Sequence, residues 1–212
     1  MSVEEANRQA VQVVVFSTVL TQLLAVILGT ITVTGEYSTG MVRSTLTAVP
    51  GRVAPLFAKA LVVAVTMFVT SAVVFSVAAA VSGPLLPAGA LDLSDPDSSI
   101  MPLLGAALYL ALIAATGVGI GFIIRNGPGA LAVGIGLVFV APILVLFFPQ
   151  LDSFQWIHEA ASYLPSNAGQ SLFMGSPMTG QPLDTVPALV TLGVWTAAAL
   201  VGGLAVLKTR DA

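Results

Sequence analysis

The chain has 212 residues, of which 57% are hydrophobic and 8% are charged, and it contains no cysteine. Soluble globular domains carry about 25% charged residues, because their surfaces must be solvated. The composition therefore excludes a soluble enzyme and, since the chain has no basic patch, a nucleic-acid-binding protein. The missing cysteines exclude disulfides and thiol catalysis, and a single histidine, His158, excludes a histidine cluster.

Apolar stretches of about 20 residues recur along the chain, and each is long enough to cross a hydrocarbon layer about 30 Å thick as an α-helix. They predict an all-α fold, a polytopic transmembrane helical bundle that forms one domain over residues 1–212. The predicted spans cover residues 11–34, 53–81, 102–124, 130–148 and 188–207. The N-terminal residues lack the basic start of a cleavable signal peptide, so insertion depends on the spans themselves.

Three long polar segments separate the spans, and they differ in charge. The loop at residues 35–52 carries Arg43 and Arg52, whereas the loop at residues 83–101 holds aspartates and neither Lys nor Arg. Within the third loop, residues 149–187, the pattern LDSFQWIHEAASYL predicts a short amphipathic helix lying in the membrane interface. Trp156 and Tyr163 are typical of that depth.

The basic residues predict the orientation of the spans in the membrane. Placing the loop at residues 35–52 in the cytoplasm puts six basic residues inside and only Arg8 outside, as the positive-inside rule favours. Those six are Arg43, Arg52, Lys59, Arg125, Lys208 and Arg210. We therefore expect a multi-pass protein of the inner (plasma) membrane, with a cytoplasmic C-terminus and external loops at residues 83–101 and 149–187. Five spans then place the N-terminus outside, so we also expect a further span upstream of this chain.

The loop at residues 35–52 reads GEYSTGMVRSTLTAVPGR, and an Ala-Lys step follows early in the next span. This arrangement resembles the permease subunits of type-2 ATP-binding cassette exporters, in which a motif E-Y-x-x-G-x-x-R-x-x-L precedes a turn and an Ala-Lys step. The residues in matching places are Glu36, Tyr37, Gly40, Arg43, Leu46, Pro50, Arg52, Ala58 and Lys59. The similarity extends along nearly the whole chain, although the family usually has six spans rather than five.

The resemblance implies partners and a mechanism. The loop at residues 35–52 would contact a cytoplasmic ATP-binding cassette ATPase subunit, and a second permease subunit, identical or different, would complete the membrane part. ATP would bind to the ATPase subunit, so this chain would need no cofactor, and transport would proceed by alternating access. On physical grounds alone, the same residues could equally be an ordinary solvated loop, or a short helix that seats Leu46 in a partner's groove while Arg43 pairs with acids.

The residues within the spans bear on three other functions: an ATPase, a gradient-driven carrier and a membrane scaffold. The segment from Gly203 to Thr209 lacks the second glycine of a phosphate-binding loop, so the chain has no ATPase site of its own. A gradient-driven carrier is disfavoured because no span carries a deeply placed ionisable residue. The polar span residues, such as Gln22 and Thr196, fit hydrogen bonds between helices as well as they fit transport, and the span glycines predict close packing of the helices. A non-transporting membrane scaffold or immunity-type protein shares this composition and remains an alternative.

Overall fold

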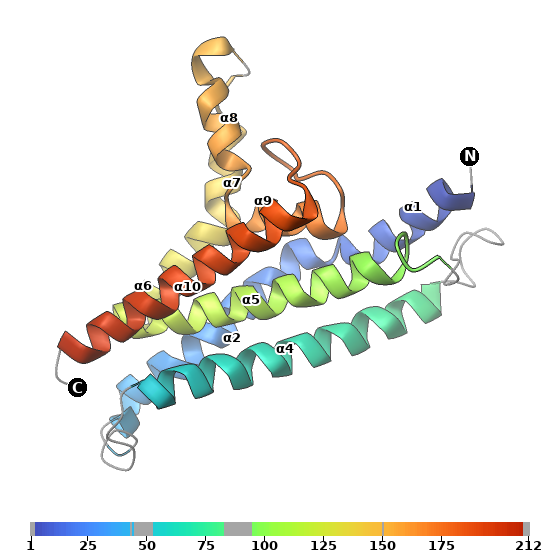
Figure 1. Cartoon of the computed structure of the whole chain (residues 1–212). Helices are drawn as coiled ribbons and strands as arrows, with labels where there is room; N and C mark the ends of the chain where they lie inside the picture. Colours follow the sequence, from blue (N-terminus) through green and yellow to red (C-terminus); the bar gives the residue numbers. More distant parts are fainter. Residues whose placement is uncertain (1–2, 43, 45–52, 83–94, 150, 210–212) are drawn as a thin grey trace.

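The computed structural model describes residues 3–42, 44, 53–82, 95–149 and 151–209 (Figure 1). Within these ranges the chain is predominantly helical and contains no strand. Five stretches are long and apolar enough to cross a membrane, namely Ala10–Thr39, Val53–Ser82, Ile100–Ile124, Gly127–Val145 and Thr185–Thr209. The predicted all-α fold with five spans is confirmed, and the protein is a multi-pass membrane protein.

The first span consists of α1 (Val3–Val15) and α2 (Thr18–Thr39), which meet at a short turn. The prediction that the span ends at residue 34 and that a loop starts at Gly35 is wrong, because α2 continues through the polar residues that follow. The helix ends where Gly40 adopts a left-handed conformation with φ of 74°, which glycine does without steric cost. The end of the helix is therefore set by the cap and not by the end of the apolar stretch.

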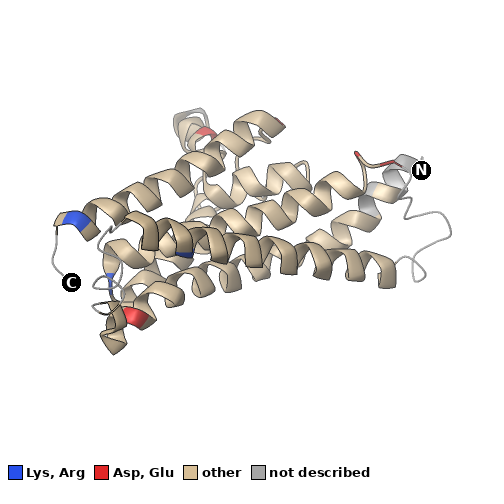
Figure 2. Ribbon diagram, turned by 60° about the horizontal axis from the view of Figure 1, so that its bottom comes forward, with Lys and Arg blue, Asp and Glu red and all other residues tan. Residues whose placement is uncertain are grey.

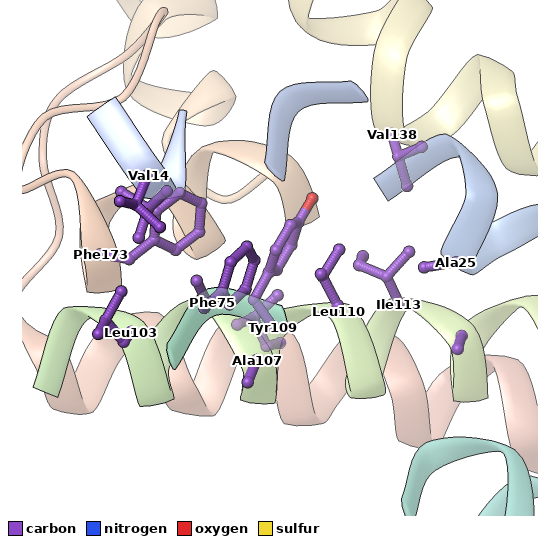
Figure 3. Close-up of a cluster of buried hydrophobic side chains, with 14 of the residues drawn as sticks. Val14, Ala25, Phe75, Leu103, Ala107, Tyr109, Leu110, Ile113, Val138 and Phe173 are labelled. Carbon is purple, nitrogen blue, oxygen red and sulfur yellow. The ribbon is translucent and has the colours of Figure 1, made fainter. Parts of the chain in front are cut away.

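Helix α5 (Ile100–Ile124) lies at the centre of the bundle and is largely buried between α2, α4 (Val53–Ser82) and α10 (Thr185–Thr209) (Figure 1). Apolar side chains from several helices meet around its first half. Figure 3 shows Tyr109, Leu110 and Ile113 of α5 pointing toward residues of α1, α2 and the π-helical turn η2 (Gly136–Val140). In lipid, close packing of this kind stabilises a bundle, because the surroundings are as apolar as the core.

Glycines allow α5 to approach its neighbours at two crossings. A Cβ on Gly117 would lie 2.7 Å from the Val26 carbonyl oxygen of α2, and a Cβ on Gly119 would lie 2.6 Å from the Ala199 carbonyl oxygen of α10. Both distances are too short for a real side chain, so a larger residue would force the helices apart. The predicted packing role of the span glycines is confirmed at these positions.

The fourth span is irregular. It starts with α6 (Gly127–Ile135), passes through the π-helical turn η2 (Gly136–Val140) and ends with α7 (Ala141–Val145), three residues earlier than predicted. Pro142 lacks the N–H of a regular helix, and its ring would meet the carbonyl four residues earlier, so the widened turn before it relieves this clash. Beyond this turn, α7 and α8 (Gln155–Ala161) rise away from the long helices (Figure 1).

The loop predicted at residues 149–187 contains three helical pieces. They are η3 (Asp152–Phe154), α8 (Gln155–Ala161) and α9 (Pro165–Phe173). The short helix that we predicted in the first part is confirmed by α8, and Trp156 and Tyr163 are exposed as an interfacial position requires. The remainder is not irregular throughout, because α9 is a buried helix that packs against α5 and α10.

Basic residues gather at one end of the bundle. There α2, α5 and α10 end and α4 and α6 begin, and the Lys and Arg residues that Figure 2 colours blue lie toward this end, together with one acidic residue. We call it the basic end and define it by Lys59, Arg125 and Lys208. Asp95 and Asp97 precede α5 at the opposite end. The other predicted cytoplasmic residues, Arg43, Arg52 and Arg210, lie outside the described residues.

Candidate functional site

The residues of the predicted ATPase-contact motif fall into two groups. Glu36, Tyr37 and Gly40 are described, the first two on the last turn of α2 and the third at its cap. Arg43, Leu46, Pro50 and Arg52 lie outside the described residues, so the geometry of the site is built from the α2 end and its neighbours.

Glu36 forms an ion pair with Lys59 of α4. Their side chains are 23% and 17% exposed, so both charges are largely shielded from solvent. Such a pair is favourable only while both partners are present, because either charge left alone would be poorly solvated. The pair therefore ties the end of α2 to the start of α4, across the connection that carries the rest of the motif.

Tyr37 turns away from Glu36, because successive residues on a helix point about 100° apart, and it contacts α5. Its ring lies edge-on to Phe122 with centroids 6.4 Å apart. The Arg125 guanidinium lies 5.2 Å from the centroid of the same ring, which is within the range of a cation–π interaction. The second residue of the motif thus joins α2 to the end of α5.

Arg125 connects this contact to α10. Its Nη2 donates a hydrogen bond of 3.0 Å to the Val206 carbonyl oxygen, which belongs to the last turn of α10, where carbonyls lack intrahelical partners. Arg125 has φ of 57° and caps α5 in the left-handed conformation, a position that glycine usually occupies. Its side chain explains why an arginine stands there, since it binds the ring of Tyr37 and the end of α10.

We call the set Glu36, Lys59, Tyr37, Arg125 and Val206 the end cluster. It brings α2, α4, α5 and α10 together through contacts between residues that are far apart in the sequence. The motif pattern identified Glu36, Tyr37 and Lys59 but not Arg125 or Val206. A sequence signal for Arg125 existed, because it is the one basic residue in the tight connection between the third and fourth predicted spans.

Neutral polar groups are buried deeper in the bundle. Tyr109 donates to Gln22 Oε1, and the hydroxyls of Thr116 and Thr196 lie 3.1 Å apart. Gln22 and Thr196 therefore take part in hydrogen bonds between helices, one of the two roles expected for them. Among the described residues, no group of three His, Cys, Asp or Glu side chains lies close enough to hold a metal ion.

The neutral polar side chains of α9 form hydrogen bonds with residues on both sides of the helix in the sequence. Asn167 Nδ2 donates to the Ala161 carbonyl and to Thr179 Oγ1, each at 2.7 Å, and Gln170 Oε1 accepts from the Met178 N–H at 2.7 Å. We call this region the α9 seat and define it by Asn167, Gly169 and Gln170.

No family model, curated protein or solved structure matches this chain.

Proposed function

We propose that this chain is the membrane-spanning permease subunit of an ATP-driven exporter of the ATP-binding cassette type, located in the inner (plasma) membrane. Its resemblance to the type-2 permeases over residues 36–59 is the basis of the proposal. The structural observation that supports it best is the end cluster, in which the described motif residues contact residues of the other long helices. With the positive-inside rule, the basic end faces the cytoplasm, where the ATPase subunits would bind.

The end cluster suggests how a force on the α2–α4 connection would reach the bundle. An ATPase subunit that moved this connection would move α2 and α4 together, because Glu36 and Lys59 hold their ends. Tyr37 and Arg125 would pass the displacement to α5 and, through Val206, to α10. Since α5 packs along the other three helices, its movement would change the arrangement of all of them, as alternating access requires.

The kinds of buried side chain favour a separate ATPase subunit over an ion gradient as the energy source. None of the buried polar side chains of the described residues is Asp, Glu, Lys or Arg. Proton- or ion-driven carriers keep such groups inside the membrane despite the cost, because the gradient acts on them. Energy from a separate ATPase subunit agrees with their absence from the described core. A second permease subunit, which the resemblance implies, is part of the same proposal.

The test is copurification with an ATPase and coupling to it. The chain should be expressed with the ATPase of a neighbouring coding region that carries a Walker phosphate loop, purified in detergent and assayed for bound ATPase and ATP hydrolysis. We expect Arg43→Glu to abolish copurification, because it reverses a charge of the motif. Lys208→Glu reverses a charge at the same end outside the motif, so it should retain the partner.

The outcome also separates the exporter from the remaining alternative. A chain that copurifies with no ATPase, and whose cellular phenotype is unchanged by Arg43→Glu, would be a non-transporting scaffold or immunity-type protein. Retained copurification in Arg43→Glu with loss in Lys208→Glu would contradict the assigned contact segment.

A further inference from the structure

Helix α4 lies at the edge of the bundle and turns an exposed side away from the other long helices (Figure 1). This side carries residues at alternating spacings of four and three, which all point within about 40° of one direction on a helix. We call them the α4 seam, and they are Val62, Thr66, Val69, Val73, Ser76 and Ala80. From the first to the last the helix rises about 27 Å, nearly the thickness of a hydrocarbon layer of about 30 Å.

Every side chain of the α4 seam is short. None is larger than valine, whereas the exposed side of α2 carries Leu20, Leu24 and Leu28. Short side chains let two helices approach closely in lipid, where association depends on packing and on hydrogen bonds between helices. The valines and Thr66 are also β-branched, so they have little rotamer freedom to lose when a partner packs on them. The alternating spacing is that of left-handed helix pairs.

Two hydroxyls on this side have no hydrogen-bond partner. Thr66 and its neighbour one turn later, Thr70, are exposed, and neither side chain makes a hydrogen bond within the part of the chain that the structure describes. Thr32 and Ser76, which are also exposed, each donate at 2.7 Å to the carbonyl oxygen four residues earlier. Thr66 and Thr70 lie near the middle of α4, where acyl chains offer no hydrogen-bonding group.

Lipid accounts for the exposed valines of the α4 seam but not for these hydroxyls. A hydroxyl without a hydrogen bond is costly in apolar surroundings, and a polar group on a neighbouring helix removes that cost. Because a hydroxyl both donates and accepts, Thr66 can pair with Thr66 of an identical helix across a twofold axis. The α4 seam is therefore complementary to itself, as the interface of a symmetric dimer requires.

Helix α10 also has short residues on its exposed side, including Gly193 and Ala197. Its threonines Thr191 and Thr196 are buried instead, and each donates to a carbonyl of its own helix. No hydroxyl of α10 thus calls for a partner in the membrane, which favours α4 as the contact surface.

We propose that the α4 seam binds a second copy of this chain, with the two α4 helices parallel about a twofold axis normal to the membrane. The choice of a second copy rests on the proposed function, which includes a second permease subunit, as well as on the self-complementary hydroxyls. Both copies have the same orientation in the membrane, so residues of equal number meet and Thr66 lies opposite Thr66.

The proposal is tested by disulfide crosslinking, because the chain contains no cysteine and one introduced cysteine reports a symmetric contact. The full chain carrying Thr66→Cys is expressed without an ATPase, oxidised in its membranes with copper phenanthroline and analysed on a non-reducing gel. The matched controls are Leu61→Cys and Val74→Cys, which replace exposed residues of the same helix that point roughly 100° away from the middle of the α4 seam, to either side.

We expect about ten-fold more crosslinked dimer with Thr66→Cys than with either control, because a disulfide requires Cβ atoms about 4 Å apart. Equal crosslinking in all three variants, no dimer with Thr66→Cys, or a crosslink to a different protein would overturn the proposal. Since no ATPase is present, these results are independent of copurification with the ATPase, which tests the proposed function separately.

The hydroxyls are tested with Val69→Cys as the crosslinking reporter. Adding Thr66→Val and Thr70→Val keeps the shape of both side chains and removes the hydroxyls, so we expect about ten-fold less dimer than with Val69→Cys alone. Adding Thr66→Ser and Thr70→Ser instead keeps the hydroxyls and should retain the dimer. Undiminished crosslinking in the valine variant would show that the hydroxyls have no partner in a second copy, and the proposal would fail.

Discussion

The end cluster and the α9 seat are both polar, but they hold the protein together in different ways. In the end cluster, long charged side chains join separate helices, and Glu36 and Lys59 keep about a fifth of their surface exposed. In the α9 seat, neutral side chains are almost completely buried, with Asn167 at 0% exposure, and bond to residues just before and just after α9. The difference indicates that the basic end can rearrange at low cost, whereas the α9 seat behaves as a rigid part of the core.

The largest expected effect lies in the α9 seat, at Gly169. A Cβ there would lie 2.8 Å from Tyr109 Cγ and nearer still to two other ring carbons. Because Tyr109 is buried among α5 and its neighbours, the ring has no room to withdraw. We expect Gly169→Ala to lower the free energy of unfolding by about 3 kcal/mol, measured by denaturant titration in mixed micelles.

The matched control for this substitution is Gly193→Ala. It adds the same methyl group to a helix at a position with open space and should change stability by no more than about 0.5 kcal/mol. Equal effects of the two substitutions would mean that α9 is not seated against Tyr109.

The next effect concerns Asn167, whose amide donates two buried hydrogen bonds. Asn167→Ala removes the hydrogen bonds to the Ala161 carbonyl and to Thr179 Oγ1, so we expect the free energy of unfolding to fall by about 2 kcal/mol in the same titration. Asn167→Asp keeps the size of the side chain and removes the donors, and it should be at least as destabilising. A stable Asn167→Asp protein would show that the side-chain volume matters and the hydrogen bonds do not.

These two regions also explain how far the sequence could predict the structure. The spans were predictable because their length and apolar composition are local properties. Helix α9 was not, because PSNAGQSLF is polar and its burial depends on hydrogen bonds to residues 178–183 that the pattern does not display. The end of α2 was misplaced for a related reason, since Gly40 and not hydrophobicity ends the helix.

The candidate site was predictable only in part. The motif identified Glu36, Tyr37 and Lys59, which are close to one another in the sequence. The contribution of Arg125 requires that the ends of α2, α5 and α10 meet, and Tyr37, Arg125 and Val206 are more than 80 residues apart in successive pairs. Only the packing of the helices brings such residues together.

At the basic end, Glu36→Gln tests the ion pair. We expect the free energy of unfolding to fall by about 1 kcal/mol, because the ion pair is shielded from solvent but still partly exposed. The charge-swapped double variant Glu36→Lys with Lys59→Glu should recover about half of the loss caused by Glu36→Lys alone. Salt distinguishes this ion pair from the α9 seat. Because about 1 M salt screens exposed charges strongly, it should reduce the difference in free energy of unfolding between Glu36→Gln and the unmodified protein.

The destabilisation caused by Asn167→Ala should not change with salt, because its hydrogen bonds are neutral and buried. A salt-independent effect of Glu36→Gln, without recovery in the swapped variant, would remove the proposed difference between the two regions.

The smallest expected effect is that of Tyr37→Phe. The ring makes the contacts with Phe122 and Arg125, whereas the hydroxyl has no hydrogen-bond partner among the described residues. In detergent without added lipid, Tyr37→Phe should therefore change stability by no more than about 0.5 kcal/mol. Tyr37→Ala should cost about 2 kcal/mol, because it removes the ring from a half-buried site.

For Tyr37→Phe, the free energy of unfolding is compared with that of the unmodified protein in detergent without added lipid. A loss of more than about 1 kcal/mol in lipid-free detergent would mean that the hydroxyl already has a partner within the protein. The end cluster would then be held by neutral hydrogen bonds as well as by charge, and its contrast with the α9 seat would be smaller.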